Sequence, residues 1–163
     1  MLSKPLHGWV EVFVGEERIG VASYLTDPAM DLLDAFISYF GKDTHLPFGI
    51  SFDAEGHYFG IMEFADYLYT VNDKTVSGYL NIKEIKPESL GLVGYSGHRS
   101  MLAHLADECI HDIQDNLEVW VDWFSYADEE KSVLDARRAE LLEKSERVRN
   151  LIAEELEKIK KMD

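Results

Sequence analysis

The chain has 163 residues, 46% of them hydrophobic, and carries 31 acidic against 16 basic residues, for a net charge of −15. This size and apolar content fit one domain with a real core and exclude a disordered acidic tail. The negative field repels nucleic-acid backbones and anionic membranes, so we expect neither as a direct partner. The single cysteine, Cys109, excludes an intramolecular disulfide and a four-cysteine zinc site.

The N-terminal residues lack the apolar core of a secretory signal, and no stretch approaches the ~20 apolar residues of a membrane span. Together with the lone cysteine, this favours a reducing compartment. We therefore expect a soluble, cytoplasmic protein.

Residues 1–90 are patterned mostly as strands. Residues 9–14 and 18–25 flank the turn 15–17 and predict a hairpin. Asp27 followed by Pro28 predicts a helix start, because the carboxylate accepts from orphan backbone N–H groups and proline suits the first turn. Gly41 is expected to end this helix, whose apolar residues recur at helical spacing: Met30, Leu33, Ile37 and Phe40.

Strand patterning resumes at residues 48–52, and a turn is expected at 53–56. Residues 57–64, 67–71 and 75–85 are further strands, with another turn at 72–74. Residues 61–68 are also compatible with a short helix, and the sequence leaves this choice open. The first part of the chain is thus predicted to be an antiparallel meander of five or six strands with one packed helix.

Pro87 ends the strand region, and the remainder is patterned as two long helices. The fold class is therefore α+β. Residues 1–126 are expected to form an α+β domain that includes a helix over 98–125. Residues 127–163 are expected to form a long C-terminal helix that packs on this domain or projects from it.

The helix over 98–125 has the sharpest pattern in the sequence. Residues 91–126 hold six acids and one base, Arg99. At 100° per residue, an apolar stripe of Leu102, Ala106, Cys109, Ile113, Leu117, Trp120 and Phe124 opposes a polar face. That face consists of His104, Glu108, His111, Asp115, Glu118 and Asp122. Like charges at these spacings repel, so we expect either ordinary solvation or a surface for a basic partner, with Glu108, His111, Asp115, Glu118 and Asp122 as the partner-binding residues.

Metal binding is the alternative interpretation of this face. His104, Glu108 and His111 have helical spacings of four and three, and Glu-x-x-His occurs in carboxylate-bridged metal sites of helical bundles. Such sites take ligands from several helices, and the sequence holds only one such motif. We therefore expect no metal and no cofactor, with these three residues as weak candidates. Cys109 lies on the apolar stripe and is expected to be a core residue.

The last helix has no proline or glycine, and Asp128 is positioned to cap it. Its near-heptad seam resembles a coiled coil and is interrupted by Arg138 and Ser145; the seam residues are Leu134, Leu141, Val148, Ile152, Leu156 and Ile159. A helix of this length overhangs a small domain, so it either packs along that domain or forms a homodimer through the exposed seam.

No catalytic motif is complete. Residues 94–98 resemble a nucleophile elbow only superficially, because the second glycine comes one residue early; Ser96 is instead expected to cap a helix. Asp53 and Glu55, with His57 close by in the sequence, are compatible with an acid–base group. Both acids fall in an expected turn, where acidic residues are common for structural reasons.

We expect a non-enzymatic protein-binding protein of the inhibitor, immunity or antitoxin type, using exposed aromatic anchors among Trp9, Tyr95, Trp123 and Tyr126. The alternatives are a homodimeric assembly or adaptor protein and a metal-dependent enzyme.

Overall fold

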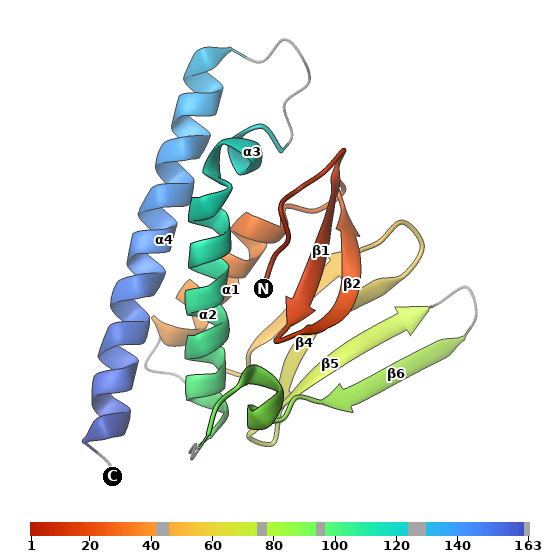
Figure 1. Ribbon diagram of the computed structural model, residues 1–163, viewed down its shortest axis with the longest axis vertical. Coiled ribbons are helices and arrows are strands. Elements are labelled where there is room, and N and C mark those ends of the chain that lie inside the picture. Colours follow the sequence, from red (N-terminus) through yellow and green to blue (C-terminus); the bar gives the residue numbers. More distant parts are fainter. Residues whose placement is uncertain (42–45, 75–77, 94–96, 124–129, 162–163) are drawn as a thin grey trace.

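The protein is α+β, with a helical layer on one side and two antiparallel sheets on the other (Figure 1). The computed structural model describes residues 1–41, 46–74, 78–93, 97–123 and 130–161. The sheets are a two-stranded hairpin and a four-stranded meander. The predicted class is confirmed, but the six strands that the structure describes divide into two sheets instead of forming one meander.

The hairpin pairs β1 (Trp9–Val14) with β2 (Glu17–Ser23). Alternate residues of β1 are buried, namely Val10, Val12 and Val14, as period-two patterning requires. A bulge between Val12 and Phe13 shifts the register. The predicted hairpin is confirmed.

Helix α1 (Pro28–Phe40) begins and ends where its local sequence predicts. The Asp27 carboxylate accepts from the backbone N–H of Met30 at 3.3 Å, and proline occupies the first turn. At the other end, Gly41 donates its backbone N–H to the Ile37 carbonyl at 2.9 Å. The apolar face of α1 is buried, including Leu32, Leu33 and Phe36.

The meander runs β3 (Gly49–Asp53), β4 (Tyr58–Phe64), β5 (Tyr67–Lys74) and β6 (Tyr79–Glu84), in that spatial order. Ala65 and Asp66 join β4 to β5 as a two-residue turn, both with positive φ. Residues 61–68 are therefore two strand ends and a turn, not a helix.

The turn predicted at residues 72–74 is wrong, because β5 continues through them. Asn72 and Asp73 pair with Asn81 and Leu80 in the ladder, and the Asn72 side chain also donates to the Ile19 carbonyl at 3.4 Å. These tertiary and cross-strand contacts override the local turn preference.

Strand β2 crosses the inner face of the four-stranded sheet, defined as the face that carries Phe52, Phe59 and Ile61. These three side chains are buried, and the Phe59 ring lies against the backbone of Gly20. A Cβ built on Gly20 would stand 2.5 Å from that ring. Glycine is thus required in β2 so that the hairpin approaches the sheet closely.

Beyond β6 the short 3₁₀ helix Pro87–Leu90 leads to α2 (His98–Asp115) and the single-turn α3 (Leu117–Val121). The continuous helix predicted over 98–125 is therefore wrong. The break is at Asn116, whose side-chain amide donates to the Asp112 carbonyl at 3.0 Å while its backbone leaves the helical region. Asparagine side chains compete in this way with the helical backbone. Residues 124–129, including the apolar-stripe residue Phe124, lie outside the described residues.

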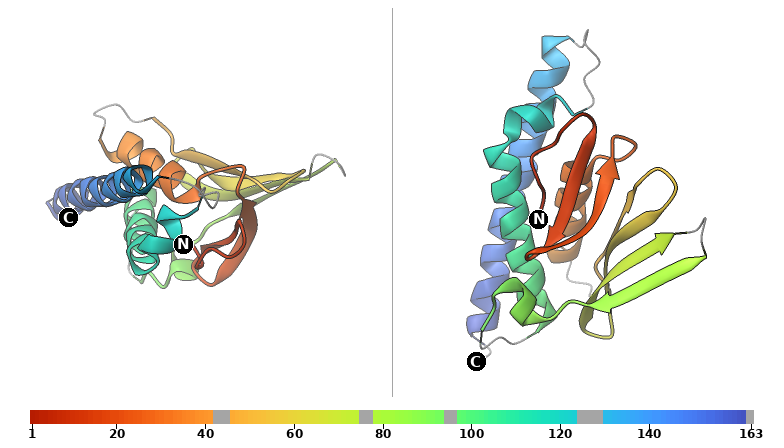
Figure 2. Two further views of the ribbon diagram at one scale, coloured as in Figure 1. Left: turned by 90° about the horizontal axis from the view of Figure 1, so that it is seen from above. Right: turned by 45° about the vertical axis from the view of Figure 1, so that its right-hand side comes forward.

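Helix α4 (Lys131–Lys160) lies alongside α1 and α2 (Figures 1 and 2). Its buried residues are Leu141, Ser145, Val148, Ile152 and Glu155. Three residues of the predicted seam, Leu141, Val148 and Ile152, are thus buried together with the interrupting Ser145, whereas Leu156 is 39% exposed. The expected cap, Asp128, falls outside the described residues. Among the described helices, none combines the length and apolarity needed to cross a bilayer.

Gly20→Val is expected to lower the free energy of unfolding by about 1–3 kcal/mol, since the added carbons overlap the Phe59 ring and force the two sheets apart. Gly49→Val is the matched control, because a Cβ at Gly49 meets nothing within 4 Å. It should change the free energy of unfolding by less than about 0.5 kcal/mol. Urea unfolding of both variants measures these changes. Equal stability of the two variants would contradict the close approach of β2 to the four-stranded sheet.

Candidate interaction surface

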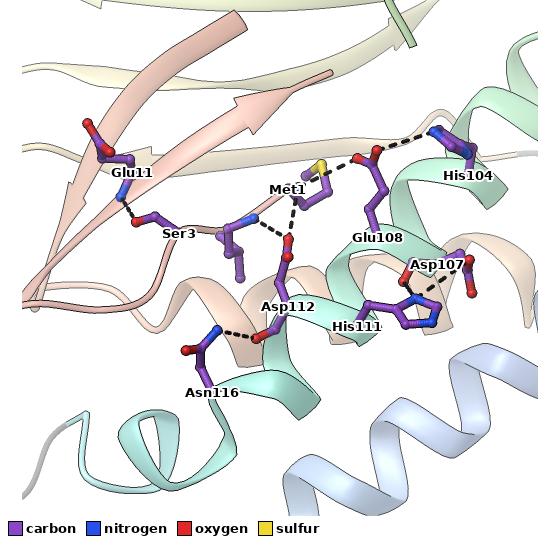
Figure 3. Close-up of polar contacts among 10 residues, drawn as sticks. Met1, Ser3, Glu11, His104, Asp107, Glu108, His111, Asp112 and Asn116 are labelled. Atoms are coloured by element: carbon purple, nitrogen blue, oxygen red, sulfur yellow. Dashed lines mark hydrogen bonds and ion pairs between the residues drawn. The ribbon is translucent and has the colours of Figure 1, made fainter. Parts of the chain in front are cut away.

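Two acidic residues of α2 hold the N-terminus instead of facing a partner (Figure 3). The Met1 ammonium lies 2.9 Å from the Asp112 carboxylate and 3.5 Å from that of Glu108. Asp112 also accepts the Leu2 backbone N–H at 2.7 Å. The remaining Glu108 oxygen is 3.3 Å from His104 Nε2. Glu108, a predicted partner-binding residue, is thus partly buried and engaged within the chain.

The other residues of the predicted face are divided by the break at Asn116. His111 Nδ1 is turned towards the Asp107 carbonyl, 2.8 Å away, so the imidazole does not join His104 and Glu108 (Figure 3). Glu118 lies on α3 and receives two hydrogen bonds from Arg138 of α4, which lower its pKa. Only Asp115 and Asp122 complete the set, and both are exposed. The face is not one continuous row of unpaired acids.

Several of the remaining sequence candidates have structural roles. The Asp53 carboxylate accepts the Glu55 backbone N–H at 2.7 Å, which stabilises the turn. Trp123 is buried and donates to the Thr26 carbonyl, so it is no surface anchor, whereas Trp9 is partly exposed. Cys109 is fully buried, and burial raises the pKa of its thiol. Tyr95, Ser96 and Tyr126 lie outside the described residues.

A larger candidate surface lies on the outer face of the four-stranded sheet, the face opposite β2. Cross-strand partners share a face in an antiparallel sheet, so the register identifies its members. Six large, mainly apolar side chains on this face are exposed, with exposed fractions from 37% for Met62 to 66% for Phe64. They are Tyr58, Met62, Phe64, Tyr67, Leu80 and Ile82. Seen nearly edge-on, the sheet has the β1–β2 hairpin on one side and no described helix or strand over the other (Figure 2, left).

The outer face is hollowed at its centre. Gly49, Ser51 and Gly60 are small and adjacent in the register, and they form the floor of a hollow of about 470 Å³. Tyr58, Met62, Val71 and Leu80 also line it. Gly60 must be glycine because a Cβ there would stand 2.0 Å from the Ile50 carbonyl oxygen. A hollow with apolar walls suits the insertion of an apolar side chain from a partner.

Acidic residues flank this apolar surface. Asp53 pairs with Tyr58 across the sheet, and Asp73 lies between Tyr58 and Leu80. Glu84 pairs with Tyr69. None of the residues that the structure describes on the outer face is basic. The outer face therefore combines apolar contact area with a negative rim.

Sequence reasoning missed this surface although a signal was present. Strand β4 places apolar residues at both parities, with Phe59 and Ile61 on the inner face and Tyr58, Met62 and Phe64 on the outer face. A half-buried strand normally alternates apolar and polar residues, whereas apolar residues on both faces indicate two covered faces. Here no helix or strand that the structure describes covers one of those two faces.

Comparison of the chain with protein-family models, with curated proteins and with solved structures gives no match in any of the three.

Asp112→Asn is expected to lower the free energy of unfolding by about 1–3 kcal/mol, because the partly buried carboxylate accepts from the Met1 ammonium and from the Leu2 N–H. Asp115→Asn, at an exposed position of the same helix, should have almost no effect. Denaturant unfolding at neutral pH measures both. Equal stability of the two variants would show that the contact of the N-terminus with α2 is not stabilising.

Proposed function

We propose that the chain is a non-enzymatic protein-binding protein that recognises a basic partner through the outer face of its four-stranded sheet. The observation that carries this proposal is the set of six exposed apolar side chains on one sheet face. Contiguous apolar surface on a folded protein marks an interaction site more often than scattered exposed residues do. The hollow over Gly60 supplies a central pocket, and Tyr58, which lines it, is a residue type enriched among binding hot spots.

Charge selects the class of partner. The outer face carries Asp53, Asp73 and Glu84 at its rim, and the whole chain has a net charge of −15. A second copy of the chain would bring the same acidic rim and the same net charge to the interface, which disfavours self-association. A partner with an apolar segment flanked by lysine or arginine is complementary to both features, and its encounter would be accelerated at low salt.

This proposal keeps the function expected from the sequence but assigns partner binding to the outer face of the four-stranded sheet instead of the acidic face of α2. An inhibitor, immunity or antitoxin-type protein that captures a basic protein fits the charge and the apolar face. Homodimerisation through the last helix has less support, because Leu141, Val148 and Ile152 of the seam already pack against α1 and α2.

A random peptide display library selected on the immobilised protein tests the proposal. We expect enriched peptides to combine large apolar residues with lysine or arginine. Their affinity, measured by fluorescence anisotropy, should fall at least about tenfold on Tyr58→Ser or Ile82→Ser, which corresponds to about 1.4 kcal/mol. Amide chemical shifts in β4 to β6 should change on peptide addition.

Val93→Ser is the matched control, since Val93 is 97% exposed and lies outside the sheets. It should leave peptide affinity unchanged. Neutralising the rim with Asp53→Asn and Asp73→Asn should weaken binding at low salt and reduce its salt dependence. Three outcomes would overturn the proposal of a basic partner. They are enrichment of neutral or acidic peptides, unchanged peptide affinity in Tyr58→Ser, and a concentration-dependent dimer mass that Ile82→Ser abolishes.

A further inference from the structure

Three potential metal ligands from separate parts of the chain converge at the β4–β5 turn. Glu63 lies near the end of β4, Asp66 is in the turn, and His98 is the first residue of α2. One ligand atom from each lies within 4.8 Å of the other two. Glu63 Oε1 and His98 Nε2 are 3.2 Å apart, and their side chains are 12% and 18% exposed. The pair is therefore partly enclosed, and the exposed Asp66 carboxylate stands at its open side.

The surroundings orient Glu63 towards His98. Glu63 Oε2 accepts the backbone N–H of Phe48 at 3.1 Å, which leaves Oε1 directed to the imidazole. Groups that hold a ligating carboxylate in place in this way support metal sites.

The local charge balance favours a divalent cation. Arg99, beside His98 in α2, is paired with the buried Glu155 of α4 and lies over the Tyr39 ring with its Cζ atom 4.9 Å from the ring centroid. Its charge is thus offset within the chain. Glu63 and Asp66 then contribute two carboxylate groups beside the His98 imidazole, and a divalent ion would offset their negative charge.

We propose that Glu63, Asp66 and His98 bind one divalent transition-metal ion, with Zn²⁺ as the preferred species. An imidazole nitrogen and two carboxylate oxygens form a donor set that suits zinc, whereas Mg²⁺ and Ca²⁺ take oxygen ligands. Ligand atoms in a tetrahedral zinc site are about 3.4 Å apart. The Glu63–His98 separation already meets this spacing, and a rotation of the exposed Asp66 side chain completes it. Three protein ligands leave a fourth position for water or an external group.

This site differs from the metal candidate suggested by the sequence, in which His104, Glu108 and His111 do not converge. It is also independent of the proposed peptide-binding surface, although the two adjoin. Phe64 and Tyr67 of the outer face flank the turn that carries Asp66, so an ion held there would restrain that end of the face.

Calorimetric titration of chelator-treated protein with ZnCl₂ tests the site. We expect a 1:1 isotherm, and at least about tenfold weaker affinity for Asp66→Asn. This variant should fold normally, because asparagine tolerates the positive φ of Asp66, 68°. Substitution with Co²⁺ should give a ligand-field absorption spectrum that Asp66→Asn changes. MgCl₂ and CaCl₂ should bind at least tenfold more weakly than ZnCl₂.

His104→Ala is the matched control, since His104 forms the other histidine–glutamate pair of α2. It should leave zinc affinity unchanged, whereas His98→Ala should lower it at least tenfold. If His98→Ala does not fold, the zinc titration of Asp66→Asn alone tests whether these residues bind the ion. Absence of a 1:1 zinc isotherm, loss of binding in His104→Ala, unchanged affinity in Asp66→Asn, or tighter binding of Ca²⁺ would overturn the proposal. None of these outcomes changes the expected peptide binding in chelator.

Discussion

The contact of the Phe59 ring with the backbone of Gly20 governs how the two sheets fit together. It lets β2 cross the inner face of the four-stranded sheet at close range, and α1 covers that face further along through Phe36, which stacks on Phe48. Among the residues that the structure describes, the elements that cover the sheet therefore all lie on one side. The outer face keeps its apolar side chains exposed as a direct consequence of this one-sided packing.

In the helical layer, ion pairs and hydrogen bonds of charged side chains connect the helices to one another and to the N-terminus. Arg137 of α4 pairs with Asp27, the N-cap of α1, at 2.7 Å and donates to the Trp120 carbonyl at 2.9 Å. Arg138 pairs with Glu118 of α3, and Asp112 of α2 holds the N-terminus. Several acids that looked available to a partner are thus used for internal attachment. The negative charge of the chain acts more as a long-range field than as one acidic patch.

The apolar outer face and the Glu63–Asp66–His98 group meet at the β4–β5 turn. In this turn Ala65 and Asp66 both adopt positive φ, a conformation that aspartate tolerates and that alanine adopts with some strain. The turn places Phe64 and Tyr67 on the outer face and the Asp66 carboxylate beside α2. A short segment thereby links a surface suited to protein contact with a donor set suited to a cation.

Local sequence patterns are sufficient to predict the β1–β2 hairpin, the Asp27 and Gly41 boundaries of α1, and the amphipathic character of α2 and α4. These depend on period, caps and turn residues, which act within a few positions along the chain. Tertiary structure decided the rest. Strand β5 runs through residues 72–74 because its backbone pairs with β6 and the Asn72 amide donates to the Ile19 carbonyl. The exposed sheet face follows from where β2 and α1 pack. Glu63 and His98 are brought together by chain topology, because no local pattern relates residues that far apart in sequence.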